Sequence, residues 1–163
     1  MGRTGRAYRR IRANFTDQPT FFSWVREGKI AASGRPFSKK QVDWLRGHGV
    51  TAILSLTEEP LPEAWTRGME TRHVSMKDHA APNPSEMRLG ADYLASALGR
   101  GNVVLVHCLA GKGRTGSVLA AYMMAYEGKT ARQALDELRS TRGGSVEHAQ
   151  EPAVLEFEAE ALR

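Results

Sequence analysis

Short apolar runs alternate along the chain with segments in which apolar residues recur every three or four positions. Residues 50–56 (VTAILSL) and 103–107 (VVLVH) are almost continuously apolar, which is typical of buried strands. Residues 71–76 (TRHVSM) form a weaker strand pattern. Because parallel strands covered on both faces read as apolar runs rather than as alternating ones, these segments predict a mostly parallel sheet.

Helix-start signals lie between these strands. The segments 38–41 (SKKQ), 83–86 (NPSE) and 130–133 (TARQ) each have the spacing of a capping box, in which two side chains bond to the free N–H groups of a first turn. Apolar residues on one helical face follow the second and third boxes: Met87, Ala91, Leu94 and Leu98, then Ala134, Leu135 and Leu138.

Two further segments predict helices. Residues 117–126 are apolar nearly all round, which indicates a central, buried helix. A last helix is expected over about residues 152–162, with Leu155, Ala159 and Leu162 facing inward. Strands that alternate with helices predict a single α/β domain, with a mostly parallel central sheet flanked by helices.

Composition is consistent with one globular domain. The 163 residues are 41% hydrophobic and 25% charged, which excludes a wholly disordered chain. No apolar run approaches the roughly 18 residues needed to span a bilayer, so we expect no membrane span. The single cysteine excludes an internal disulfide and any zinc site built from several cysteines.

The positive charge is concentrated at the N-terminus. The chain carries a net charge of +5, and residues 1–20 contain five arginines and one aspartate, a net of +4. We therefore expect residues 1–20 to be a disordered basic extension and residues 21–163 to form the domain. A basic arm leaves nucleic-acid or acidic-lipid binding open, but a solvated terminus is the simpler interpretation. No targeting signal is found, so the expected location is the cytoplasm.

The segment that carries chemistry is residues 107–116 (HCLAGKGRTG), between the clearest strand and the most apolar helix. Its three glycines allow the loop to curl around an anion, which N–H groups at the helix N-terminus attract. Arg114 adds a planar fork that suits a tetrahedral oxyanion. The same field stabilises a thiolate at Cys108, to which the Thr115 hydroxyl can donate a hydrogen bond. One loop can thus bind a phosphate and direct a nucleophile at it.

Asp78 is the candidate general acid. Transfer of a phosphoryl group to sulfur requires a proton for the departing oxygen. Asp78 lies between the weaker strand and the predicted helix start at Asn83, in a loop that can reach over a neighbouring strand end. When water hydrolyses the thiophosphate, the same carboxylate would act as base.

These residues carry a resemblance to a known family. Cysteine, five residues and then Arg-Thr, preceded by His107, is the signature of the cysteine-dependent protein tyrosine phosphatases. The chain resembles the small atypical dual-specificity phosphatases and the short archaeal tyrosine phosphatases from about Phe22 to Phe157, including 22–25 (FSWV), 54–58 (LSLTE) and 144–147 (GSVE).

The resemblance implies a protein tyrosine phosphatase-like fold and phosphorylated proteins as substrates, and we expect neither a cofactor nor a metal. It implies Cys108 as nucleophile, Arg114 as phosphate and transition-state ligand, Asp78 as acid and base, and Thr115 as helper of thiolate release. The phosphate would be bound by Leu109, Ala110, Gly111, Lys112, Gly113 and Arg114, with His107 holding the shape of the loop from below.

Two positions leave alternatives open. Related enzymes often place a glutamine near the last loop to position the hydrolytic water; Gln150 is the candidate, and Glu147 competes for the role. A lysine at the position of Lys112 also occurs in the lipid-phosphatase branch. That branch usually has a second loop lysine, at the position where this chain has Leu109. We interpret Lys112 as a residue that adds positive charge to the phosphate-binding loop.

The expected substrate is phosphotyrosine, with some activity on phosphoserine and phosphothreonine, because the chain is too short for the added tyrosine-recognition loop of larger enzymes. Phosphoinositides and RNA 5′-phosphates remain alternatives, as do a non-catalytic phosphate-binding module and a sulfur-transfer enzyme.

Two rival readings of the site fit the sequence less well. Residues 111–116 also match the dinucleotide fingerprint G-x-G-x-x-G, but residues 130–139 are helical where a Rossmann unit needs a strand. The possible metal ligands match no metal-binding spacing; they are His73, Asp78, His79, His107 and Cys108.

Overall fold

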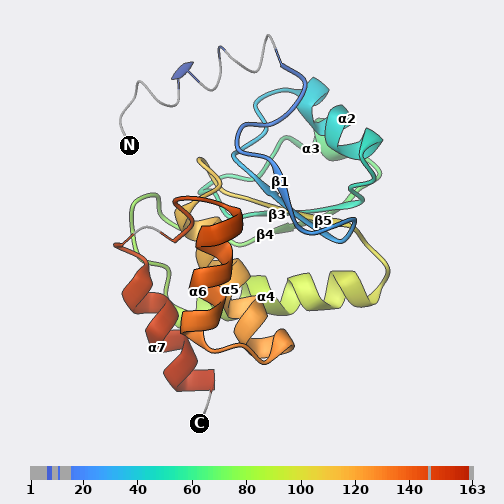
Figure 1. The fold of residues 1–163 in the computed structure, drawn as a ribbon. Helices are drawn as coiled ribbons and strands as arrows, with labels where there is room; N and C mark the ends of the chain where they lie inside the picture. Colours follow the sequence, from blue (N-terminus) through green and yellow to red (C-terminus); the bar gives the residue numbers. More distant parts are fainter. Residues whose placement is uncertain (1–6, 9–10, 12–15, 147, 162–163) are drawn as a thin grey trace.

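The computed structural model describes residues 7–8, 11, 16–146 and 148–161. Within these residues one sheet has the strand order β1-β2-β5-β3-β4 (Figure 1). The strands are β1 (Ser23–Arg26), β2 (Ile30–Ser33), β3 (Ala52–Ser55), β4 (Glu70–His73) and β5 (Val104–His107). β1 runs antiparallel to β2, and the other neighbouring pairs are parallel. The predicted α/β class with a mostly parallel sheet is confirmed.

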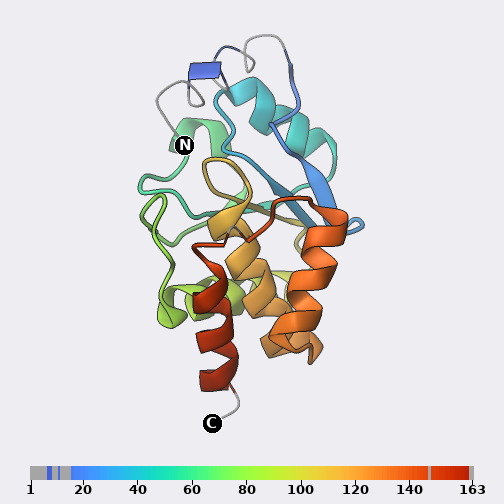
Figure 2. The same cartoon turned by 60° about the vertical axis from the view of Figure 1, so that its left-hand side comes forward.

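Helices cover both faces of the sheet unequally. The smaller layer consists of α2 (Lys39–Gly47) and the single turn α3 (Glu63–Thr66). The opposite face carries α4 (Pro84–Gly99), α5 (Gly113–Glu127), α6 (Ala131–Thr141) and α7 (Glu151–Ala161), as Figures 1 and 2 show. α5 lies at the centre of this larger layer, because it packs against α4, α6 and α7.

The central strands are buried on both faces, which explains their continuous apolar sequence. Every residue of β3 and β5 is buried. Ile53 and Leu105 point into the core beneath α2 and α3, whereas Leu54 and Val106 point into the core beneath the larger helical layer. Alternate residues of one strand therefore belong to different cores, as the period of a strand requires.

The three predicted helix starts are confirmed. The Ser38 side chain accepts a hydrogen bond from the Gln41 N–H at 3.3 Å at the start of α2. Asn83 and Glu86 form a reciprocal capping box at the start of α4, with N···O distances of 2.8 and 3.0 Å. A second reciprocal box starts α6 at Thr130. These caps satisfy first-turn N–H groups that no residue inside the helix can reach.

The structure corrects the sequence analysis for the inward face of α7. Leu155 is 50% exposed, and the residues that pack inward are Ala153, Val154 and Phe157. Apolar residues occur on several sides of this helix, so the sequence does not define one inward stripe. Packing against α4 and α5 selects the face that buries the large Phe157 ring.

Two strands were not predicted, and one helix starts earlier than expected. β1 and β2 are four-residue strands, and β2 (IAAS) is too short and too rich in small residues to resemble a strand. α5 begins at Gly113, four residues before the expected start, so the glycine-rich segment itself forms its first turn.

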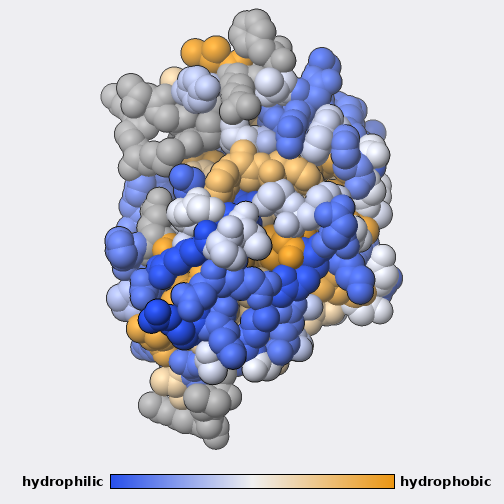
Figure 3. Space-filling model, in the orientation of Figure 1, coloured by the Kyte–Doolittle hydropathy of each residue, from blue (hydrophilic) through white to orange (hydrophobic). Residues whose placement is uncertain are grey.

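Most of the predicted basic extension lies outside the described residues, including all five of its arginines. In the part of the chain that the structure describes, no helix has the length and apolar character needed to cross a membrane. Figure 3 shows hydrophilic residues over much of the lower part of one face, which is the side of the larger helical layer in Figure 1.

Candidate active site

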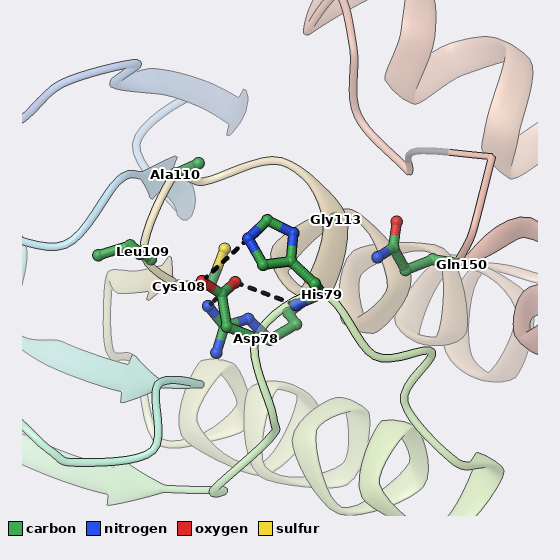
Figure 4. Close-up of a pocket in the computed structure, with 8 residues that line it drawn as sticks. Asp78, His79, Cys108, Leu109, Ala110, Gly113 and Gln150 are labelled. Carbon is green, nitrogen blue, oxygen red and sulfur yellow. Dashed lines mark hydrogen bonds and ion pairs between the residues drawn. The ribbon is translucent and has the colours of Figure 1, made fainter. Parts of the chain in front are cut away.

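The glycine-rich segment connects the central strand to the central helix. β5 lies in the middle of the sheet and ends at His107, and α5 starts at Gly113. The loop between them therefore lies at the carboxyl end of a parallel strand, where open α/β sheets bind ligands. A pocket opens there, lined by Asp78, His79, Cys108, Leu109, Ala110, Gly113, Arg114 and Gln150 (Figure 4).

Cys108 lies at the base of this pocket and is only 3% exposed. The Gly111 N–H donates a hydrogen bond to Cys108 Sγ at 3.2 Å, and the first turn of α5 begins two residues later. A backbone N–H group and the positive end of a helix both favour negative charge at this point. The loop thus has the geometry expected of an anion-binding site around a thiolate.

Gly111 is required by the shape of the loop. Its φ is +77°, in the left-handed region that side chains rarely adopt. A Cβ at this position would lie 2.5 Å from the carbonyl carbon and oxygen of Ser33, which are backbone atoms of β2. The loop can therefore pack this closely on the sheet only with glycine here.

Arg114 is a buried cation with two carboxylate partners. Its side chain is 3% exposed; Nη2 lies 2.7 Å from Asp78 Oδ1, and Nη1 lies 3.3 Å from Glu58 Oε2. Nη1 also donates to the Met76 carbonyl at 2.9 Å. These contacts bring together the two residues that the sequence analysis selected 36 positions apart.

Asp78 and His79 form the side of the pocket opposite the loop. Asp78 precedes α4, and its carboxylate faces Arg114. His79 adopts a φ of +59°, and its Nε2 lies 3.5 Å from Asp78 Oδ2 (Figure 4). In the sequence, His79 belongs only to a set of possible metal ligands that match no metal-binding spacing. A left-handed histidine has no local sequence signal that places it at this site.

Glu58 is a site residue that the sequence reasoning missed. It follows β3, and its carboxylate accepts a hydrogen bond from the Asp78 N–H at 2.8 Å while also contacting Arg114. Burial would raise the pKa of Glu58, but the bonds from the Asp78 and Glu58 N–H groups and from Arg114 outweigh it and lower the pKa. Glu58 therefore anchors the Asp78 loop as an anion. The sequence feature that could have identified Glu58 as a site residue is its position just after the apolar run of β3.

His107 supports the loop from inside the sheet. It is fully buried, and burial lowers its pKa to about 3, so the ring is neutral at physiological pH. Nδ1 lies 3.3 Å from the Cys108 carbonyl, which can only accept, so Nδ1 carries the proton. Nε2 then accepts from the Ser55 hydroxyl at 2.8 Å, a partner that the β3–β5 register places opposite His107.

The structure separates the remaining candidates. Gln150 reaches the pocket from the segment before α7 and is 3% exposed, and its Oε1 has no hydrogen-bond partner among the described residues. Its competitor Glu147 lies outside the described residues. Thr115 is fully buried, but its hydroxyl has no partner in the described part of the chain, so the expected bond to Cys108 Sγ is not formed.

Lys112 differs from the other loop residues. Its Nζ lies 5.2 Å from the centroid of the Phe21 ring, and its side chain packs beside Gly144. The pocket is lined by Leu109, Ala110, Gly113 and Arg114 without the Lys112 side chain. Within the described ranges, no three histidine, cysteine, aspartate or glutamate side chains are placed to share a metal ion.

A buried cysteine in a glycine-rich loop, at the N-terminus of a central helix and beside an Arg–Asp pair, defines a site of the cysteine-dependent phosphatase type. Comparison with known proteins agrees. The family model described as "Swiss Army Knife protein, DSP-PTPase phosphatase domain" matches residues 19–155. The chain therefore belongs to this family of phosphatase domains, as the resemblance predicted.

Individual relatives extend this finding. The chain is 28% identical over 148 residues to tyrosine-protein phosphatase cdc-14 of Caenorhabditis elegans, covering 83% of this chain and 21% of the relative. It is 26% identical over 148 residues to phosphatidylglycerophosphate phosphatase PTPMT2 of Arabidopsis thaliana, covering 87% and 65%. The active form of Tk-PTP superposes with a TM-score of 0.75 at 29% identity, covering 85% of this chain and 96% of that one. The chain thus spans about a fifth to two thirds of the length of these two curated relatives.

Proposed function

We propose that this protein hydrolyses phosphomonoesters through a cysteinyl-phosphate intermediate, with phosphotyrosine in proteins as the preferred substrate. The observation that carries the proposal is the position of Cys108 Sγ. The sulfur lies in a pocket that Asp78 and Arg114 also line, and it accepts a hydrogen bond from the Gly111 N–H. The groups that we propose as nucleophile, phosphate ligand and proton donor therefore line one pocket.

In the first step, the Cys108 thiolate attacks phosphorus, forming an S–P bond as the P–O bond to the leaving group breaks. Loop N–H groups and the Arg114 fork bind the phosphoryl oxygens and stabilise the charge that builds up on them. Arg114 already faces the pocket, held by the Met76 carbonyl and by Glu58. Because these contacts fix its orientation, little reorganisation is needed when the substrate binds.

Asp78 supplies the proton to the leaving oxygen. In the described state its carboxylate is paired with Arg114. A substrate phosphate that takes over the Arg114 donors removes that cation from Asp78 and adds an anion nearby; both changes favour the protonated carboxyl that a general acid needs. The Glu58 bond to the Asp78 N–H holds the loop in place during this exchange.

In the second step, water attacks the cysteinyl phosphate, the S–P bond breaks, and Asp78 accepts the proton of the water. The buried Gln150, whose Oε1 lacks a hydrogen-bond partner in the described residues, is the group we assign to positioning this water. We assign Thr115 to thiolate release, which requires its buried hydroxyl to turn toward Sγ when the thiolate departs. This chemistry needs no cofactor, and we propose that it needs no metal, since Arg114 and the loop N–H groups bind the phosphate.

The Arabidopsis relative makes a lipid phosphate the second candidate substrate. A strongly anionic lipid headgroup would be bound best by lysines that point into the pocket. Lys112 lies over Phe21 instead, and position 109 is leucine. The arrangement of this loop therefore favours a phosphorylated protein over a phospholipid.

The test is hydrolysis of p-nitrophenyl phosphate in excess EDTA by wild type and Cys108→Ser. Activity that is resistant to EDTA and lost in the variant is expected. Activity that survives in Cys108→Ser would show that another group is the nucleophile, and loss of wild-type activity with EDTA would show a metal requirement. A folded but inactive wild type would favour a non-catalytic phosphate-binding module.

A second assay addresses substrate choice. kcat/KM is compared for phosphotyrosine and phosphoserine peptides, phosphatidylglycerophosphate vesicles and a 5′-phosphorylated RNA oligonucleotide. The phosphotyrosine peptide is expected to give the highest value. A higher value for the lipid or the RNA would overturn the assignment of substrate while leaving the mechanism in place.

A further inference from the structure

A second buried arginine lies behind the loop. Arg142 follows α6 and is 2% exposed. Its Nη2 donates to the Gly111 carbonyl at 2.9 Å and to the Phe21 carbonyl at 3.1 Å. Its Nη1 donates to the Ala32 carbonyl at 3.1 Å and to the Ser23 hydroxyl. One guanidinium therefore joins β1, β2 and the segment before them to the phosphate-binding loop.

The partners of Arg142 are all neutral, which distinguishes it from Arg114. Arg114 pairs with the carboxylates of Asp78 and Glu58. Arg142 forms no ion pair within the described residues; its contacts are carbonyl oxygens, one hydroxyl and the Phe21 ring, 4.5 Å from Cζ. Burial lowers the pKa of Arg142 to about 10, against the attraction of Cys108, and the group stays charged at neutral pH.

A buried charge without an opposite charge is costly, so a nearby anion is expected to balance it. Gly111 connects Arg142 to the nearby Cys108. The Gly111 carbonyl accepts from Arg142, and the Gly111 N–H donates to Cys108 Sγ. The left-handed Gly111 packs closely on the Ser33 backbone, and its carbonyl is bonded to Arg142, so its N–H has little freedom to turn away from sulfur.

We propose that Arg142 is a positioning residue for the reaction: it fixes the Gly111 N–H on Cys108 and supplies buried positive charge that favours a negative charge on Cys108 Sγ. The proposal deepens the proposed function and rests on it for the link to turnover. Its electrostatic half concerns the cysteine alone and can be measured without any substrate.

Other charged or titratable groups around Cys108 come from each element packed against the loop. They are Arg114 on α5, Asp78 and His79 before α4, Glu58 after β3, His107 on β5, Arg35 after β2 and Lys112 in the loop itself. His107 is neutral, and Arg114 is paired with Asp78 and Glu58. Arg142 is thus a buried cation beside the loop that has no carboxylate partner in the described chain.

The experiment measures the rate of iodoacetamide alkylation of Cys108 against pH, which reports the thiolate fraction because the chain has no other cysteine. Arg142→Gln removes the charge and retains a donor for Gly111, whereas Arg142→Lys retains the charge and loses the fork. Arg132→Gln is the matched control, since Arg132 lies on α6 with an 85% exposed side chain.

In Arg142→Gln the midpoint of alkylation is expected to rise by about one pH unit or more. In Arg142→Lys the midpoint should stay near that of the wild type, while kcat falls about tenfold or more, because a lysine cannot bond to Gly111, β1 and β2 at the same time as the guanidinium does. Arg132→Gln should leave both values unchanged. A folded Arg142→Gln with the wild-type midpoint would overturn the electrostatic half of the proposal.

The lysine variant keeps the proposal testable if Arg142→Gln does not fold. An unchanged kcat in Arg142→Lys would overturn the positioning half, and a midpoint displaced by a unit despite the retained charge would overturn the electrostatic half. If the wild type hydrolyses no phosphomonoester, the proposed function fails, but the alkylation midpoints still decide whether Arg142 stabilises the thiolate.

Discussion

Arg114 Nη2 lies 2.7 Å from Asp78 Oδ1, so the ligand expected for the phosphate and the expected proton donor form an ion pair across the pocket. Glu58 contacts both residues, through the Arg114 side chain and the Asp78 backbone. A bound phosphate would compete with the Asp78 carboxylate for Arg114. Binding of the phosphate and release of the Asp78 carboxylate are therefore linked through the Arg114 guanidinium.

The acid role of Asp78 predicts a loss of activity that depends on the leaving group. With an alkyl phosphate, Asp78→Asn should lower kcat/KM by about 10²–10⁴-fold, because the alkoxide needs its proton. With p-nitrophenyl phosphate the loss should be much smaller, because p-nitrophenolate leaves without one. Asp136→Asn, an exposed acid on α6 with a 63% exposed side chain, is the control. Equal losses for the two substrates would contradict the acid role.

Replacing Glu58 with glutamine should raise the affinity for phosphate but lower turnover. In Glu58→Gln the negative charge beside Arg114 is removed, so the inhibition constant of inorganic phosphate should fall by about two- to fivefold, the scale of a partly exposed ion pair. kcat should decrease, because the anchor of the Asp78 N–H is weakened. Glu59→Gln removes an exposed carboxylate one residue away and should change neither value. Weaker phosphate inhibition in Glu58→Gln would refute this account.

Replacing Gly111 with alanine should reduce turnover by more than backbone strain alone explains. Gly111→Ala places a Cβ within 2.5 Å of the Ser33 backbone, so the loop must move and turnover should fall by at least about 100-fold. Gly128→Ala is a matched control: its φ is +69°, but a Cβ there meets no atom within 4 Å.

Both glycine variants should lose about 1–2 kcal/mol of unfolding free energy from left-handed strain. Only Gly111→Ala should also lose activity at a temperature at which both proteins are folded, as checked by circular dichroism. Comparable turnover in the two variants would show that the loop tolerates displacement from β2.

The sequence predicted the parts of this site that are encoded locally. The apolar run of β5, the glycines after it and the cap at Asn83 each have a signal within a few residues, and they locate Cys108, Arg114 and the Asp78 loop. Glu58 has only its position after the apolar run of β3 as a signal, and His79 and Arg142 have no local signal. Glu58 and Arg142 act through contacts with residues 20 or more positions away, and the position of His79 depends on a left-handed backbone. The inward face predicted for α7 is also wrong, because tertiary packing decides which face of this helix is buried.

His107 predicts an acid sensitivity that is built into the core. Its pKa is about 3 in the folded protein and about 6.5 in an unfolded chain. Between these values the unfolded chain takes up a proton that the folded protein does not, so stability falls as the pH falls through this window. At pH 5.0 this one group should cost about 2 kcal/mol of unfolding free energy relative to pH 7.5.

Urea unfolding of wild type and His107→Asn at these two pH values isolates the contribution. Asparagine can replace the Nδ1 donor to the Cys108 carbonyl, but it does not titrate. The variant should be less stable than wild type at pH 7.5, because Ser55 loses its acceptor, yet it should lose about 2 kcal/mol less on acidification. His48→Asn, which removes an exposed ring at the end of α2, is the control. An equal loss in wild type and His107→Asn would mean that the buried ring is not what makes the fold sensitive to acid.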